Sequence, residues 1–187
     1  MSTQGDPAAS PRPDVAALAN DAAMAGSWVL DASASRVEFS VRHFWGAVNV
    51  RGRFDQIAGA ASVGPDGSVT GTLTMAAASV NTGNKQRDKH LRSADFFDAG
   101  RHAEVVVTVT EAKPDGQAEL ACRGTLEAAG RSRAIAFTAR IGEAAAQAVV
   151  LDAEIVVDRT DWGMTWSPLK IAAPQARGTV TARFVRP

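Results

Sequence analysis

The sequence predicts an all-β protein in which about eight antiparallel strands close into a barrel, with a β-sandwich as the alternative arrangement. Apolar and polar residues alternate along most of the chain, which is the pattern of strands with one buried face. Short clusters of Gly, Pro and Asp separate these runs and predict tight turns. Two internal segments lack the alternation, so the fold has few helices with which to cover an open sheet.

The chain has 187 residues, the usual size of one domain, and 45% of them are hydrophobic. We expect residues 27–187 to form the β domain and residues 1–26 to precede it as a flexible tail. Residues 1–12 are rich in Pro, Ala, Ser and Gly, a composition typical of disorder. Asp14 could cap a short helix that runs to Ala25, and a frayed segment is the alternative.

The N-terminal sequence does not resemble a secretory signal. Its first basic residue, Arg12, lies between two prolines, and Asp14, Asn20 and Asp21 interrupt the apolar residues that follow. We therefore expect a cytoplasmic protein. No apolar stretch is long enough to span a membrane, so a membrane-spanning protein is not expected.

From Trp28 onward the period of the hydrophobic pattern is two. The turn signals are residues 64–67, residues 113–116, Gly130 and Gly142. Strands joined by such short turns pair in antiparallel fashion. The apolar positions of successive strands are Val37, Phe39, Val41, Val48, Val50, Phe54, Val69, Leu73, Met75, Val105, Val107, Val109, Leu120, Cys122, Leu126, Ile135, Phe137, Ile141, Val149, Leu151, Ile155, Val157, Val180, Ala182 and Phe184.

The two segments without alternation are predicted to be helical or looped. Residues 84–93 contain no β-branched residue and read as a short helix, which residues 95–98 follow. Residues 158–168 predict a turn or a helical hook.

Bulky residues are too few to fill a closed barrel. Aromatic residues make up 6% of the chain and Tyr is absent. An apolar cavity is costly when empty and favourable when an apolar molecule fills it. We therefore expect a ligand-holding lumen, provided that the small residues of the strands face inward. These residues are Gly52, Gly71, Ala76, Ala121, Gly124, Ala139 and Ala153.

Composition argues against several classes of function. The 20 basic and 20 acidic residues balance, which does not favour nucleic acid as a partner. Cys122 is the one cysteine, so an intramolecular disulfide is impossible and a small core residue is expected. The spacing of His43, His90 and His102 matches no standard zinc motif, so we expect no metal site.

Several blocks, in order, carry a resemblance to a known family. The blocks are Trp28–Asp31 with Ser35–His43, Val50–Phe54, Ser79–Asn84 with Arg87–Asp88, His90–Ser93 and Asp95–Asp98, Gly124–Leu126, and Val157–Met164. Together they resemble the YceI-like family of bacterial proteins over residues 27–187. The chain departs from the family pattern at Ala103, where proline is usual, at residues 127–129, and in lacking the export signal of many members.

The resemblance implies an eight-stranded, antiparallel, lipocalin-like barrel with one or two short helices. It also implies a bound polyisoprenoid, quinone or similar lipid-like molecule, and no required cofactor or catalytic residue. We expect the lumen or its mouth to be lined by Phe39, Val41, His43, Phe54, Leu73, Met75, Leu91, Phe96, Phe97, Val107, Phe137, Trp162 and Met164.

Some of these residues have a second interpretation. His43 is expected to point inward, either toward a ligand head group or as a satisfied core histidine. Trp162 and Met164 could line the lumen or pack the core. Arg87 and Asp88 are expected to form an ion pair at the mouth or to tie down their loop, and Asp158 and Arg159 to act as a second structural clamp.

The leading hypothesis is therefore a carrier that binds and sequesters an apolar or amphiphilic small molecule. One alternative is an enzyme acting on an apolar substrate, for which His43 near Asp88 would be the best available catalytic pair, though a poor one. The other is an interaction module whose core is filled. Whether the protein forms a homodimer is left open.

Overall fold

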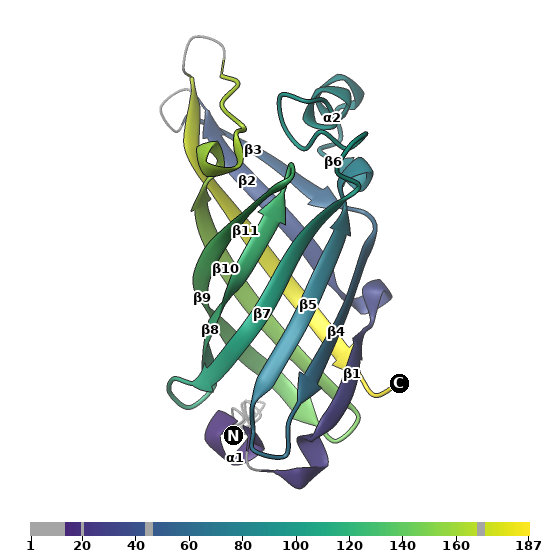
Figure 1. Cartoon of the computed structure of the whole chain (residues 1–187), viewed down its shortest axis with the longest axis vertical. Helices are drawn as coiled ribbons and strands as arrows, with labels where there is room; N and C mark the ends of the chain where they lie inside the picture. Colours follow the sequence, from purple (N-terminus) through teal and green to yellow (C-terminus); the bar gives the residue numbers. More distant parts are fainter. Residues whose placement is uncertain (1–13, 20, 44–46, 168–170) are drawn as a thin grey trace, which may run out of the picture.

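One antiparallel sheet curls round and closes on itself through the pairing of β1 (Gly26–Leu30) with β11 (Ala172–Val185). The structure is a computed structural model that describes residues 14–19, 21–43, 47–167 and 171–187. Figure 1 shows the strands running obliquely around a single barrel. The predicted closed barrel is thus confirmed, and the sandwich is not formed.

Eleven strand segments make eight long strands, because three of the long strands are interrupted. β1 and β2 (Arg36–His43) both run antiparallel to β11, one after the other along its length. β3 (Val48–Phe54) pairs with β2, and β4 (Ile57–Val63) continues it along β1. In the third long strand β5 (Val69–Ala76) pairs with β4, and β6 (Val80–Asn81) pairs with β3.

Short 3₁₀ turns explain two of these interruptions. The Asp31 side chain accepts hydrogen bonds from the backbone N–H groups of Ser33 and Ala34, which caps the turn η2 (Ala32–Ala34) between β1 and β2. The turn η4 (Ala77–Ser79) separates β5 from β6. The remaining long strands are β7 (Glu104–Pro114), β8 (Glu119–Ala128), β9 (Arg131–Ala145), β10 (Ala148–Asp158) and β11.

The predicted turns fall where expected, with one exception. Gly67, Gly116 and Gly130 adopt positive φ angles between strands, a conformation that glycine reaches without strain. Gly142 instead lies inside β9, where the register with β10 shifts beside Val150. The sequence-based turn at Gly142 was wrong, because a glycine within a strand also marks a β-bulge.

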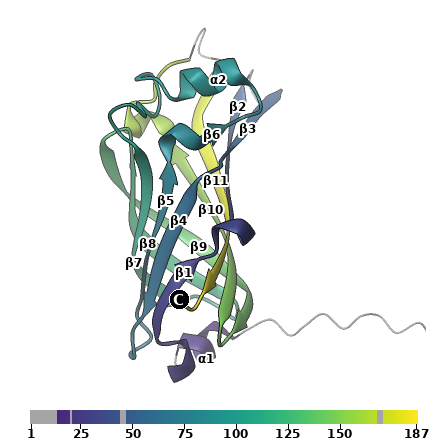
Figure 2. The same ribbon diagram turned by 90° about the vertical axis from the view of Figure 1, so that its right-hand side faces the viewer.

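Helices lie at the two ends of the barrel (Figure 1). α2 (Lys85–Leu91) lies at the end that we call the upper end, and α1 (Val15–Ala19) lies at the opposite, lower end. Figure 2 shows the same placement from a perpendicular direction. Among the described residues, no helix combines the length and the apolar character needed to cross a bilayer.

Residues 14–19 and 21–26 form in part the short helix that the sequence allowed: the Asp14 side chain accepts hydrogen bonds from the N–H groups of Ala16 and Ala17. α1 is followed by the separate 3₁₀ turn η1 (Ala22–Met24), and β1 begins at Gly26. Val15 is 2% exposed and Met24 is 8% exposed, so this segment packs against the barrel. The physical reason is that the apolar side chains of this segment cover the lower end of the barrel, and their burial favours a packed segment over a solvated tail. Residues 1–13 lie outside the described residues.

Candidate functional site: an apolar lumen

Three cavities follow one another along the barrel axis. The upper cavity has a volume of about 180 Å³, the middle cavity about 120 Å³ and the lower cavity about 110 Å³. Leu73, Val107, Ile155 and Val180 line both the upper and the middle cavity. Ala61, Val69, Leu120, Leu151 and Phe184 line both the middle and the lower cavity. The three cavities therefore adjoin one another and share walls, so the core is not completely filled, and we call this row of apolar cavities the lumen.

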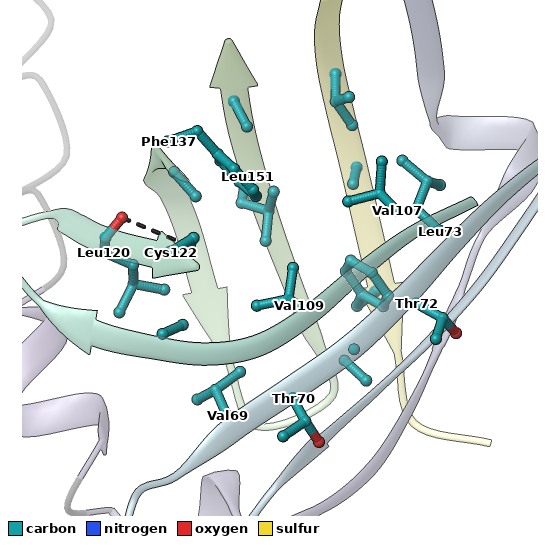
Figure 3. A pocket seen from close by; sticks show the side chains of 18 of the residues that line it. Val69, Thr70, Thr72, Leu73, Val107, Val109, Leu120, Cys122, Phe137 and Leu151 are labelled. Atoms are coloured by element: carbon teal, nitrogen blue, oxygen red, sulfur yellow. Dashed lines mark hydrogen bonds between the residues drawn. The ribbon is translucent and has the colours of Figure 1, made fainter. Parts of the chain in front are cut away.

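Strand alternation explains why the lumen is apolar. Successive side chains of a strand point to opposite faces of the sheet. Figure 3 shows Val109 and Leu151 pointing into the middle cavity, whereas the hydroxyl groups of Thr70 and Thr72 point away from it. The threonines are exposed to solvent on the outer face of the barrel.

Some of the small strand residues provide the empty space, as the sequence predicts. Gly71, Ala139 and Ala153 line the middle cavity. Ala121 is exposed, so it does not meet the condition that the small residues face inward. Gly52 and Gly124 serve close packing instead: a Cβ atom at these positions would collide with the Phe39 ring and with the Thr108 carbonyl. The remaining predicted small residue, Ala76, is not among the lining residues of any of the three cavities.

The predicted lining residues gather in the upper half of the barrel. Phe137 lines the middle cavity, and His43 lines none of the three cavities. All the others line the upper cavity: Phe39, Val41, Phe54, Leu73, Met75, Leu91, Phe96, Phe97, Val107, Trp162 and Met164.

His43 is half-buried at the end of β2, where it is paired in register with Ala172 of β11 and Val48 of β3. Burial lowers the pKa of His43, and the positive charges of Arg159 and Arg87 lower it further. The neutral imidazole is therefore favoured in the folded protein. Among the described residues no hydrogen bond joins His43 to Asp88, so the catalytic pair considered for an enzyme is not formed there.

Arg87 and Asp88 both form hydrogen bonds with Thr82 and none with each other among the described residues. The Asp88 carboxylate is buried and accepts hydrogen bonds from the N–H and the hydroxyl of Thr82, at 2.8 and 2.6 Å. The Arg87 Nε–H donates to the same hydroxyl oxygen at 2.8 Å. In the described part of the chain no direct ion pair joins Arg87 to Asp88, because the Thr82 hydroxyl stands between them. The two residues tie α2 to Thr82, which directly follows β6.

Arg159 is a buried cation that is bonded to backbone oxygens. Its guanidinium donates to the carbonyls of Ala173, at 3.1 Å, Trp166, at 3.2 Å, and Met164. It thereby joins the segment after η5 (Arg159–Trp162) to the start of β11. Burial lowers the pKa of the Arg159 guanidinium, and the neighbouring Asp158 opposes this effect. Asp158 itself caps η5 by accepting hydrogen bonds from Thr160.

Aromatic rings close the upper end in two groups. The rings of Phe39, Phe54 and Phe97 lie 5.5 to 6.5 Å apart, centroid to centroid, inside the wall of the upper cavity. Outside them, the His90 ring lies edge-on to Trp166 at 4.3 Å and bonds to the Asp95 carboxylate at 2.9 Å. Trp166 remains 43% exposed, so this second group marks the boundary between the mouth and solvent.

The sequence analysis missed the lower half of the lumen as a site. Leu120, Leu151, Val180 and Phe184 had the correct strand parity, and this signal would have extended the predicted lining downward. Val15, Leu18 and Met24 also line the lower cavity. The 3-residue spacing of Val15 and Leu18 on a short helix was the available signal.

Burial raises the pKa of the Cys122 thiol in the middle cavity, so this thiol stays neutral and unreactive.

A closed antiparallel barrel of eight strands with an apolar lumen defines the lipocalin-like class of folds, in which the interior is large enough for one small ligand. Within this class, the YceI-like domain matches residues 28–184. The chain therefore belongs to the YceI-like family, as its sequence blocks predict.

Relatives and solved structures agree with this placement. A UPF0312 protein of Vibrio cholerae is 30% identical over 122 residues, which are 63% of this chain and 64% of that protein. The chain thus spans just under two thirds of the length of that relative. A UPF0312 protein of Shewanella putrefaciens is 31% identical over 134 residues, which are 69% of this chain and 70% of that protein.

Two solved structures share the fold at low sequence identity. Burkholderia cenocepacia BcnA superposes with a TM-score of 0.75 and 16% identity, covering 82% of this chain and 98% of that chain. A polyisoprenoid binding domain from Saccharophagus degradans superposes with a TM-score of 0.73 and 19% identity, covering 86% of this chain and 98% of that chain. At these identities the likeness establishes the fold.

Proposed function

We propose that this protein binds one lipid-like molecule of the polyisoprenoid class, such as a polyprenyl chain or a prenylated quinone, along the axis of its barrel. The observation that carries the proposal is the row of three adjoining apolar cavities along the barrel axis. Each methylene group moved from water into such a space contributes about 0.8 kcal/mol, so an apolar chain is a sufficient occupant. The polyisoprenoid class is supported by the description of the Saccharophagus degradans domain.

The lumen favours binding over chemistry. The side chains that point into the middle cavity are those of apolar residues and of Cys122, whose thiol stays protonated because burial raises its pKa. Three charged residues, Glu38, Arg159 and Arg177, are among those that line the upper cavity. The Arg159 guanidinium is engaged by backbone carbonyls, whereas Glu38 and Arg177 are exposed to solvent and Arg177 pairs with Glu154. General acid–base or nucleophilic catalysis needs a positioned proton carrier beside the reacting atom. Binding and carriage need only the apolar surface that is present.

The proposal is tested by purifying the full chain without detergent and recording its native mass spectrum. We expect a retained ligand, which organic extraction releases and mass spectrometry identifies as an isoprenoid. Apo-protein should then bind polyprenols and displace a fluorescent hydrophobic probe. A preparation that carries no ligand and binds no probe would overturn the proposal.

A matched pair of variants ties binding to the lumen. Ala153→Phe fills part of the middle cavity, whereas Ala121→Phe adds the same ring on the exposed face of the barrel. We expect Ala153→Phe to lower polyprenol affinity by at least about tenfold, which is 1.4 kcal/mol. Ala121→Phe should leave the affinity unchanged. Equal binding by both variants would place the ligand elsewhere.

A further inference from the structure

The lower end of the lumen is closed by a segment that precedes the family match. The YceI-like match begins at residue 28, whereas α1 and η1 lie within residues 15–24. Val15, Leu18 and Met24 of this segment line the lower cavity together with Trp28. Figure 1 places α1 across the lower end of the barrel, opposite α2. We call residues 14–19 and 21–25 the floor segment.

Specific bonds hold the floor segment against the barrel. The Val15 N–H donates to the Gln117 carbonyl at 2.8 Å, which ties α1 to the turn between β7 and β8. The Trp28 indole N–H donates to the Met24 carbonyl at 3.0 Å. From the other end of the chain, the Arg186 guanidinium donates to the carbonyls of Ala25, at 2.9 Å, and Ala23. The segment is therefore attached at both of its helical turns.

The floor segment lies in line with the path of an apolar chain. Ala61 lines both the middle and the lower cavity and is a small residue at their junction. A chain that enters from the upper end and passes Ala61 meets the side chains of Val15 and Leu18. Val15 belongs to the buried cluster that includes Leu120 and Ile141. Because these side chains are closely packed, they restrict displacement of the Val15 side chain by a ligand.

We propose that Val15, Leu18 and Met24 set the length of the apolar chain that the lumen accepts. The inference rests on the proposed function, and it adds the residues that determine specificity for chain length. Affinity rises about fourfold for each methylene group that the lumen buries. Once the end of the chain reaches the floor segment, further methylene groups stay in water or must bend, and the affinity stops rising.

The experiment measures, on the full chain, the affinity for a homologous series of straight-chain primary alcohols by displacement of a fluorescent probe. In the wild type we expect the steep rise to end in a plateau at one chain length. Val15→Ala combined with Leu18→Ala should move the plateau to longer alcohols. Val29→Ala is the matched control, because it shortens a valine that is 44% exposed on β1, and it should keep the wild-type plateau.

A second variant shifts the plateau in the opposite direction. Ala61→Phe blocks the junction between the middle and lower cavities, so the plateau should move to shorter alcohols. Ala61→Val serves the same purpose with less added volume if the Phe variant does not fold. Ala60→Phe, on the exposed face of β4, is the control and should leave the plateau in place.

The outcomes separate this inference from the proposed function. If the affinity reaches its plateau at the same alcohol length in the wild type, the floor variant and the Ala61 variants, the role of the floor segment is overturned. The lumen then remains the binding site. A wild type that binds no alcohol and no polyprenol overturns the proposed function and the length limit with it. Opposite shifts in the two sets of variants support the inference.

Discussion

The guanidinium carbon of Arg186 lies 4.2 Å from the centroid of the Trp28 ring. Trp28 is 2% exposed in β1, and Arg186 follows β11, the strand that closes the barrel against β1. The cation thus covers an aromatic face at the barrel closure while it donates hydrogen bonds to two carbonyls of the floor segment. One side chain near the C-terminus therefore links barrel closure to the closing of the lower end.

Replacing Arg186 by Met should loosen this end of the molecule. The variant loses a cation–π contact and two charge-assisted hydrogen bonds, so we expect the free energy of unfolding to fall by about 2 kcal/mol. Hydrogen exchange should also accelerate at the Val15 amide. Arg101→Met is the control, because the Arg101 side chain is 82% exposed. Equal behaviour of the two variants would show that the Arg186 contacts do not hold the floor segment.

Replacing Asp88 by Ala should release α2 from the upper end. The buried carboxylate accepts two hydrogen bonds from Thr82, and its removal leaves both donors unpaired, at a cost of about 2 to 3 kcal/mol. Chemical denaturation of Asp88→Ala, Thr82→Val and the double variant measures this coupling. The double variant should be more stable than the sum of the two single losses predicts. Strict additivity would contradict a direct contribution of this contact.

Replacing Arg159 by Lys should not preserve the loop that follows η5. A lysine ammonium cannot reproduce the forked geometry by which one guanidinium reaches three carbonyls. We expect a loss of about 2 to 3 kcal/mol in unfolding free energy and a changed near-ultraviolet spectrum from Trp162 and Trp166. Arg177→Lys is the control, since Arg177 and Glu154 form a half-exposed pair. Its effect should lie within about 0.5 kcal/mol.

Acid should destabilise the protein in part through His43. The pKa of His43 in the folded state lies below the ordinary value of 6.5, because of burial and then of Arg159 and Arg87. As the pH falls through 6.5, the unfolded chain binds a proton before the folded chain does, so stability decreases until the lowered pKa is passed. His43→Asn should therefore show a shallower decrease in this window. Denaturation midpoints measured across it test the prediction, and parallel curves for both proteins would refute it.

The strand pattern predicted the upper site because alternation depends only on neighbouring residues. Leu73 and Met75 lie two residues apart on β5, and both line the upper cavity. At Ala121 the same rule also holds: Leu120 and Cys122 point inward, so Ala121 between them is exposed, and its small apolar side chain alone was a poor guide to its orientation. The sequence also brought Arg87 and Asp88 together as candidates, but the Thr82 hydroxyl that separates them became visible only in the folded loop.

The sequence by itself determined the class of fold, the family and the apolar character of the interior. These follow from the period-two pattern, the turn residues and the motif blocks, all of which are local in the chain. The tertiary structure alone decided that the floor segment closes one end of the lumen and that Arg186 holds it there. Arg186 is separated from Ala23 by 163 residues, and no local rule of propensity or spacing relates residues so far apart until closure of the barrel brings them into contact.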